Sequence, residues 1–278
     1  MAISAKDVNR LRQATGAGMM DCKKALVEAD GDFDRAIEIL REKGQKVSAK
    51  RAGREAKEGA VFIKDDGNGE ATLIELNCET DFVARNEDFQ SLGQSIVELA
   101  AAEKPADLEG LKALTLGDKT VADALTEAIG KIGEKLDLSK FHTVKGEHVV
   151  TYTHPGARIG VAVAFAGVAE GDVPQVGKDV AMQIAAMNPV AIDKDGVPSD
   201  VVEKEIEIGK EQARQDGKPE QILEKIAMGK LNKFYKENTL LNQEFVKDTS
   251  KTVSQYIKDS LGKEATVSEF KRVQLGAS

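Results

Sequence analysis

The sequence predicts an α+β protein made of several small modules. Apolar residues recur at helical spacing through residues 1–45, whereas the order strand, strand, helix occurs twice between residues 59 and 197. Helical spacing returns over residues 198–237. Since the chain has 278 residues, it can hold one large domain or about two to three small ones.

The N-terminal module, residues 1–45, is expected to contain three short helices. Their apolar stripes are Val8 and Leu11, then Cys22, Ala25, Leu26 and Ala29, then Phe33, Ala36, Ile37 and Leu40. Asp32 is a good N-cap for the third helix, which is expected to end at Gly44. Residues 46–58 are rich in Lys, Arg and Ala and lack clear periodicity, which indicates a basic linker.

The first core subdomain, residues 59–140, is expected to begin with strands at 61–63 and 72–78. In the second strand apolar and polar residues alternate, which indicates a sheet that is buried on one face only. Asn86 is expected to cap the following helix, whose first turn is acidic and therefore favourable for the helix dipole. A further helix is predicted over Val121–Ile132.

The second core subdomain, residues 141–197 and 238–278, repeats this order. Strands are expected at 149–152 and 159–165, followed by a helix at 178–186 and a last strand at 270–275; these bounds come from apolar patterning alone.

Residues 198–237 interrupt this subdomain and predict an inserted antiparallel helical hairpin. Ser199 is expected to cap its first helix, and a Gly- and Pro-containing turn at residues 216–219 separates it from the second.

Composition narrows the class of protein. The net charge of −8 argues against a general nucleic-acid binder, although residues 1–57 carry 13 Lys/Arg against 9 Asp/Glu and could meet an acidic partner. Two cysteines are too few for a disulfide scaffold and fit a reducing compartment. The longest apolar stretch, residues 159–169, is too short for a membrane helix, and the N-terminus lacks the apolar region of a signal peptide. A soluble cytoplasmic protein is expected.

Two runs of sequence resemble a known family. Residues 15–26 read Thr-Gly-Ala-Gly-Met-Met-Asp-Cys-Lys-Lys-Ala-Leu, and residues 77–86 read Asn-Cys-Glu-Thr-Asp-Phe-Val-Ala-Arg-Asn. In wording, order and distance from the N-terminus they resemble the signature stretches of the elongation factor Ts family, the bacterial and organellar nucleotide exchange factors for elongation factor Tu. The resemblance covers nearly the whole chain. It implies a ubiquitin-associated-like N-terminal module, a duplicated core and a coiled-coil insertion.

The resemblance also implies a function and the residues that perform it. The factor would bind the GDP form of elongation factor Tu, dislodge Mg²⁺ and promote GDP release so that GTP can rebind. The element that intrudes into the GTPase domain and dislodges the metal would be Thr80, Asp81, Phe82 and Val83. Further contacts with the partner would come from Arg12, Met19 and Met20, with Lys23 on the same face, and from His154, beside which Pro155 departs from the family pattern.

Taken without the family, three positions keep a second interpretation. Phe82 could close the strand-to-helix turn over its own core, although Phe89 already supplies an inward aromatic ring to the next helix. Met19 and Met20 are about 100° apart on a helix, so at least one should be exposed unless both fill gaps in the core. His154 could be an ordinary turn histidine.

The sequence predicts no catalytic site. It contains neither the phosphate-loop pattern nor a Gly-x-Gly-x-x-Gly run followed by a ribose-binding carboxylate. His142, His148 and His154 are evenly spaced, but glycines and a proline break the segment and no cysteine joins them, so neither a metal nor a cofactor is expected. Cys22 and Cys78 lie on apolar stripes and are expected in the core.

The expected partner is elongation factor Tu, in a heterodimer or, if the factor associates with itself, in a heterotetramer, without direct contact to nucleic acid or membrane. The main alternative is a scaffold protein that binds a partner without exchange activity. A thiol- or metal-dependent enzyme and an RNA-binding protein that uses the basic linker are less favoured by the residues.

Overall fold

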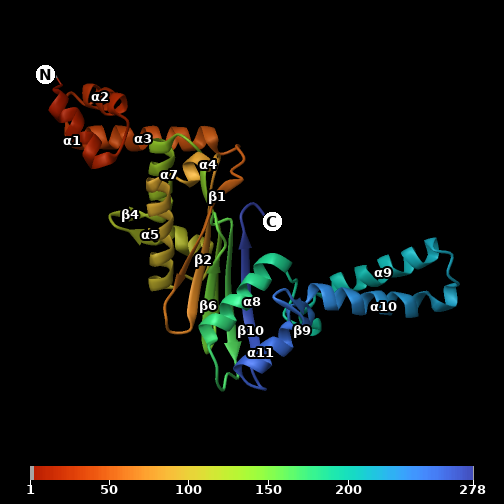
Figure 1. Ribbon diagram of the computed structural model, residues 1–278. Helices are drawn as coiled ribbons and strands as arrows, with labels where there is room; N and C mark the ends of the chain where they lie inside the picture. The colour runs from red at the N-terminus through yellow and green to blue at the C-terminus, as the bar shows by residue number, and fades with distance from the viewer. Residues whose placement is uncertain (1–2, 278) are drawn as a thin grey trace.

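The computed structural model describes residues 3–277. Three N-terminal helices lie at one end, two sheets with their covering helices form the middle, and a pair of long helices projects from the far side (Figure 1). The predicted α+β class is confirmed.

The N-terminal helices are α1 (Ala5–Thr15), α2 (Met19–Glu28) and α3 (Phe33–Arg51). Asp32 caps α3 as predicted, because its Oδ1 accepts a hydrogen bond from the Arg35 N–H at 2.9 Å. The expected end of α3 at Gly44 is wrong, since the helix continues to Arg51. Gly44 is a packing residue: a Cβ added at Gly130 of α7 (Val121–Ile132) would lie 2.7 Å from its Cα, so the two helices cross in close contact.

Two antiparallel sheets of three strands form the middle of the molecule. The first has the order β1 (Glu58–Asp65), β2 (Glu70–Cys78), β5 (Leu136–Lys145), and the second has the order β10 (Thr266–Gln274), β7 (Ile159–Ala166), β6 (His148–Thr153). The boundary drawn after residue 140 lies inside β5, which pairs with β2 from Cys78↔Leu136 to Glu70↔Lys145.

The sheets pack face to face, and helices cover both outer faces. Small side chains such as Ala162 and Ala164 lie between the sheets together with Leu73. This arrangement corrects the expectation that β2 is buried on one face, because every residue of β2 is buried. Two of its buried polar residues are paired with each other: Asn77 Nδ2 donates to Glu75 Oε1 at 2.8 Å. Lys140 Nζ lies 3.2 Å from the other Glu75 oxygen, Oε2.

α5 (Glu87–Glu103), α6 (Leu108–Ala113) and α7 pack on the first sheet, and α8 (Val173–Met187) and α11 (Val253–Leu261) pack on the second. Three of the covering helices, α5, α7 and α8, were predicted from the sequence, whereas α6 and α11 were not. The short strands are β3 (Thr115–Leu116), β4 (Lys119–Thr120), β8 (Glu244–Phe245) and β9 (Asp248–Thr252), and the single 3₁₀ turns are η1 (Lys194–Gly196) and η2 (Leu240–Asn242).

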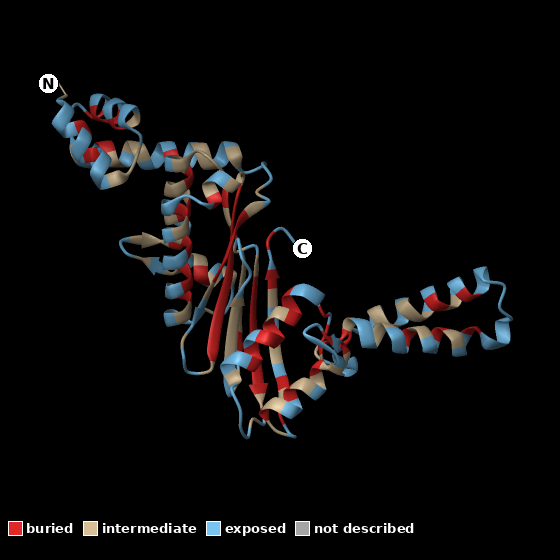
Figure 2. Ribbon diagram, viewed as in Figure 1, coloured by how far each residue is buried: buried red, intermediate tan, exposed pale blue. Residues whose placement is uncertain are grey.

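The projecting pair consists of α9 (Ser199–Gln215) and α10 (Glu220–Asn238), which lie side by side. Their buried residues face each other, while their outer sides are exposed (Figure 2). Gly209 permits this approach, because a Cβ there would lie 3.0 Å from the Ala227 Cα. Ser199 does not cap α9: it is the first helical residue, and Pro198 holds the extended N-cap backbone without a side-chain hydrogen bond.

Candidate partner-binding site

The run from Thr80 to Val83 forms a short tip at the end of β2. The strand ends at Cys78, and α4 (Asp81–Ala84) follows with Thr80 as its N-cap. Thr80 Oγ1 accepts a hydrogen bond from the Val83 N–H at 3.4 Å. Ala84 is buried and Val83 packs partly against the first core. The tip is therefore anchored on one side and free on the other.

Phe82 lies on the free side of this tip. Its relative exposure is 82%, the highest among the exposed large apolar residues, whereas Phe89 in α5 is fully buried at 0%. Phe89 packs near Phe62, with ring centroids 6.3 Å apart. The alternative in which Phe82 closes its own core is therefore excluded, and Phe89 is the inward aromatic residue as expected.

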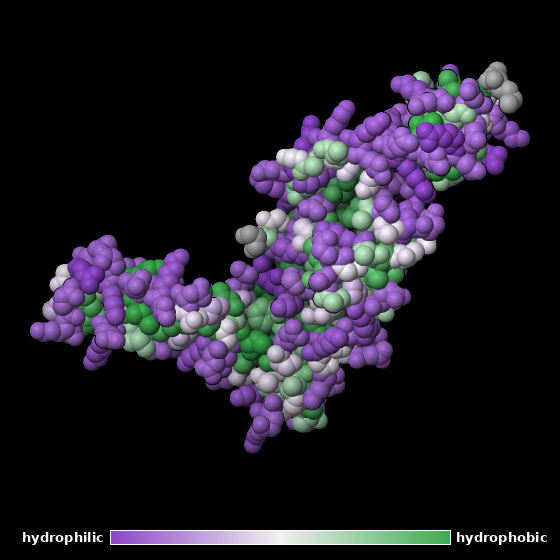
Figure 3. All heavy atoms as spheres, turned by 180° about the vertical axis from the view of Figure 1, so that it is seen from behind, coloured by the Kyte–Doolittle hydropathy of each residue, from purple (hydrophilic) through white to green (hydrophobic). Residues whose placement is uncertain are grey.

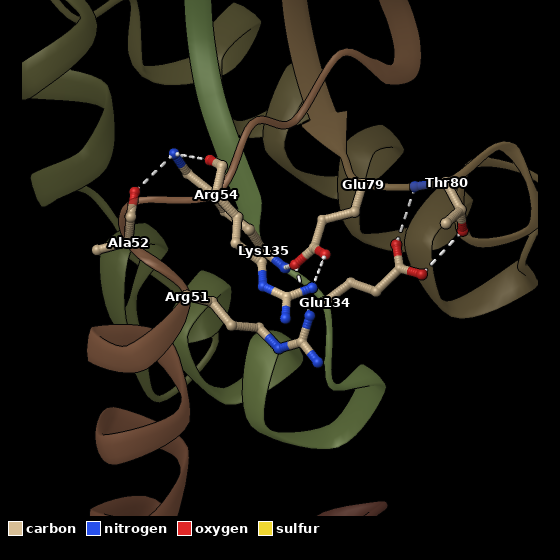
Figure 4. Close-up of polar contacts among 7 residues, drawn as sticks. All are labelled: Arg51, Ala52, Arg54, Glu79, Thr80, Glu134 and Lys135. Atoms are coloured by element: carbon tan, nitrogen blue, oxygen red, sulfur yellow. Dashed lines mark hydrogen bonds and ion pairs between the residues drawn. The ribbon is translucent and has the colours of Figure 1, made fainter.

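Two acidic residues hold the tip to the rest of the core (Figure 4). Glu134 accepts two hydrogen bonds from Thr80, one from its N–H at 3.0 Å and one from its hydroxyl at 2.8 Å. Glu79 accepts hydrogen bonds from the Lys135 N–H at 2.7 Å, from Arg51 at 2.7 Å and from Arg54 at 3.1 Å.

The electrostatics of Glu79 reflect this crowding of donors. Burial alone would raise the pKa of its carboxyl, but the Lys135 N–H and the two guanidinium groups outweigh it and lower the pKa to about 2. The side chain therefore remains a charged acceptor throughout the neutral range. Sequence reasoning missed Glu79, Glu134 and Lys135; their one signal was that Glu79 directly precedes the Thr80 run.

Asp81, the remaining member of the run, faces solvent in part. Its carboxylate pairs with Arg85 one turn later at 3.1 Å, and both side chains are substantially exposed. An exposed pair of this kind contributes little to stability, so Asp81 can exchange its partner without cost to the fold.

The second group of candidate residues lies on the N-terminal module. Met19 and Met20 at the start of α2 are 56% and 62% exposed, which confirms that both cannot face the small core. Arg12 and Lys23 are also exposed. The module lies at the other end of α3 from the Phe82 tip (Figure 1), so the structure does not place the two groups in one cluster.

His154 begins the turn between β6 and β7. It is exposed, and its Nδ1 lies 2.9 Å from the Tyr152 hydroxyl. The same turn reaches β1, because Ala157 O accepts a hydrogen bond from the Val61 N–H at 2.8 Å. The short helix α4 also contacts β1, so this turn and the Phe82 tip both adjoin that strand.

Both cysteines are buried as predicted, with 0% exposure. Burial, followed by the charge of Glu134, raises the pKa of the Cys78 thiol to about 12, so the thiol stays protonated and donates to Thr80 O at 3.1 Å. Within residues 3–277, no three His, Cys, Asp or Glu side chains come together as a possible metal site. No helix in the described part of the chain has the length and hydropathy needed to cross a membrane.

Apolar side chains are also visible on the opposite face of the molecule, gathered over its middle, while the projecting helices are mainly hydrophilic (Figure 3). Exposed aromatic and methionine side chains on separate modules are characteristic of proteins that act by contact with another protein.

Comparison with known proteins identifies the family to which this protein-binding chain belongs. The family model described as "Elongation factor TS" matches residues 79–277. Elongation factor Ts of Amoebophilus asiaticus is 55% identical over 280 residues, covering 100% of both chains. Elongation factor Ts of Cytophaga hutchinsonii is 54% identical over 275 residues, covering 98% of this chain and 99% of the relative. The chain therefore belongs to the elongation factor Ts family of translation elongation factors.

Proposed function

We infer that this chain binds the GDP form of elongation factor Tu and promotes GDP release by inserting Phe82 into the GTPase domain, which dislodges Mg²⁺. The observation that carries this proposal is the exposure of Phe82, 82%, on a tip whose neighbours Val83 and Ala84 are packed on the core. Membership of the family supports the choice of partner and of the exchange reaction.

Acceleration of GDP release requires more binding free energy than one side chain can contribute. A GTPase holds its nucleotide through backbone amides, a lysine and a bridging Mg²⁺. An acceleration of GDP release by about 10⁵ lowers the barrier by roughly 7 kcal/mol, whereas burial of one Phe contributes about 1.5–3 kcal/mol. The remainder comes from a wide interface that forms fully only with the distorted partner, and Arg12, Met19, Met20, Lys23 and His154 are the proposed members of that interface.

The role of the factor is therefore one of coupled binding rather than bond chemistry. If the factor weakens nucleotide binding by a given ratio, nucleotide must weaken factor binding by the same ratio. Incoming GTP thus releases the factor. Thr80 and Val83 hold the tip, while Asp81, whose exposed pair with Arg85 is easily broken, disturbs the polar network around Mg²⁺.

The modular assignment follows from the same proposal. Residues 1–45 act as the ubiquitin-associated-like module, residues 46–58 as the basic linker and residues 198–237 as a coiled-coil hairpin inserted into the second core subdomain. The complex forms in the cytoplasm as a heterodimer, or as a heterotetramer if the factor self-associates, and needs neither nucleic acid nor membrane.

Release of fluorescent GDP from elongation factor Tu, followed by stopped flow, tests the proposal. Phe82→Ala is expected to slow release at saturating factor by about tenfold or more, while complex formation is largely retained. Met187→Ala, which shortens another exposed apolar side chain (45% exposed), is the matched control and should behave like the unaltered protein. Unchanged release with Phe82→Ala contradicts the wedge role, and binding without acceleration by the unaltered protein identifies a scaffold instead.

A further inference from the structure

Two pairs of consecutive residues form a reciprocal clamp beneath the Phe82 tip. The Glu79 carboxylate accepts the Lys135 N–H at 2.7 Å, and the Glu134 carboxylate accepts the Thr80 N–H at 3.0 Å. Each segment thus satisfies a backbone donor of the other, although 54 residues separate Thr80 from Glu134 in the chain. The clamp (Glu79, Thr80, Glu134 and Lys135) joins the end of β2 to the α7–β5 connection (Figure 4).

Glu134 determines how the Thr80 hydroxyl is used. The hydroxyl donates to Glu134 Oε1 at 2.8 Å, which directs its lone pairs toward the Val83 N–H that it caps at 3.4 Å. α4 has only four residues, and so short a helix is not stable without tertiary support. Because Phe82 itself is largely exposed, its direction depends on the cap and on the buried side of α4.

The clamp also reaches the N-terminal module. Arg51 in the last turn of α3 and Arg54 just beyond it bind the two oxygens of Glu79 at 2.7 and 3.1 Å. In return, Lys135 Nζ donates to the carbonyl oxygens of Ala52 and Arg54, both at 3.0 Å. The helix that carries the module therefore ends in contact with Glu79 and Lys135, two of the four clamp residues.

We propose that Glu134 is a positioning residue for exchange: by fixing Thr80 it holds Phe82 in the direction needed for insertion, without contacting the partner's nucleotide itself. This inference rests on the proposed function. A side chain that is already oriented loses less conformational freedom on binding. The free energy saved in this way lowers the barrier of the step in which Phe82 inserts. Loss of the clamp therefore lowers the rate of GDP release and leaves most of the interface intact.

The test is a titration of GDP-bound elongation factor Tu with factor, which yields a maximal release rate and a half-saturating concentration. Glu134→Ala is expected to reduce the maximal rate by about fivefold or more while it changes the half-saturating concentration by less than about twofold. Glu134→Gln keeps the size and one good acceptor, so its rate should fall between those of Glu134→Ala and the unaltered protein. Glu109→Ala removes an exposed glutamate on α6 (side chain 82% exposed) and is the matched control.

A double-mutant cycle separates positioning from general damage to the fold. If Glu134 acts through Phe82, Glu134→Ala should cause no further loss of rate in a Phe82→Ala background. An equal loss in both backgrounds overturns the proposal, as does an unchanged maximal rate for both Glu134 variants. Failure of the unaltered protein to accelerate release instead contradicts the proposed function, so the two failures are distinguishable. If Glu134→Ala does not fold, as judged by circular dichroism, the cycle is performed with Glu134→Gln.

Discussion

At the scale of single residues, Glu79 is the most strongly held carboxylate near the tip, and its behaviour with pH can be predicted. Its pKa is lowered from 4.5 to about 2 in the folded protein, against the effect of burial, by Lys135 N–H, Arg51 and Arg54. A lowered folded-state pKa gives stability that is complete above the unfolded value and is lost as pH falls toward the folded value. The Glu79 contribution to the free energy of unfolding should therefore decline between about pH 4.5 and pH 2.

Urea unfolding at a series of pH values checks this prediction. Glu79→Gln should be less stable than the unaltered protein at neutral pH, and the difference between the two should shrink as pH falls through that window. Glu109→Gln is a suitable control, because the Glu109 side chain is 82% exposed and lies on α6. A difference that stays constant from pH 7 to pH 2 contradicts the assigned ionisation.

Residues also show where sequence reasoning succeeds. Spacing and context were enough to place Phe89 and both cysteines inside and to expect at least one of Met19 and Met20 on the surface, because these are properties of one helix or one turn. The clamp was not foreseeable in this way. Glu79 and Glu134 become partners of Lys135 and Thr80 only when distant segments meet. No local sequence pattern identifies a glutamate whose carboxylate accepts a hydrogen bond from a backbone N–H of a distant segment.

At the scale of helices, the crossing of α3 and α7 predicts opposite effects of the same substitution at two glycines. Replacement of glycine by alanine inside a helix usually stabilises it by about 0.5–1 kcal/mol. In α10 a Cβ at Gly229 would meet nothing within 4 Å, so Gly229→Ala should be stabilising. In α7 a Cβ at Gly130 would lie 2.7 Å from the Gly44 Cα, so Gly130→Ala must push the helices apart and should destabilise by about 1–3 kcal/mol.

Thermal unfolding followed by circular dichroism compares the two variants. A stabilising effect of Gly130→Ala would mean that α3 and α7 are not in close contact in solution. Because the N-terminal module is joined to the core by α3, Gly130→Ala should also increase hydrogen exchange in α3, which Gly229→Ala should not do.

The predicted elements were most accurate where the pattern is local. The bounds of α7 agree with the prediction, and Asp32 and Asn86 cap the helices that follow them. The extension of α3 was missed because glycine commonly marks the end of a helix. Here Gly44 instead lies inside α3, where it allows close contact with α7. β5 was missed because Lys140 and His142 interrupt its apolar alternation, and its pairing with β2 is a tertiary contact.

At the scale of the whole molecule, the stacking of two sheets between outer helices could not be read from the sequence. β10 pairs with β7 although residues 167–265 lie between them, and those residues include the whole of α9 and α10. The alternation in β2 is that of a sheet with one solvent-exposed face, yet the second sheet covers that face, where Asn77 and Glu75 are hydrogen-bonded to each other. The apolar and polar pattern of a strand indicates which of its side chains prefer burial. Whether a second sheet covers the remaining face depends on how the whole chain assembles.

The projecting helices are attached in a way that predicts their independence from the core. On either side of them, Val190 N–H donates to Asn238 O and Leu240 N–H donates to Ala191 O, both at 2.9 Å. The two ends of the insertion are thus already joined by the core itself.

Replacement of residues 199–237 by a short Gly/Ser linker should therefore leave the thermal midpoint of the β-rich core within about 3–4 °C of the intact protein, a shift that corresponds to less than about 1 kcal/mol in a chain of this size. Circular dichroism should show loss of helical signal with retained strand signal. Unfolding of the shortened chain at 25 °C would show instead that α9 and α10 are an integral part of the second core.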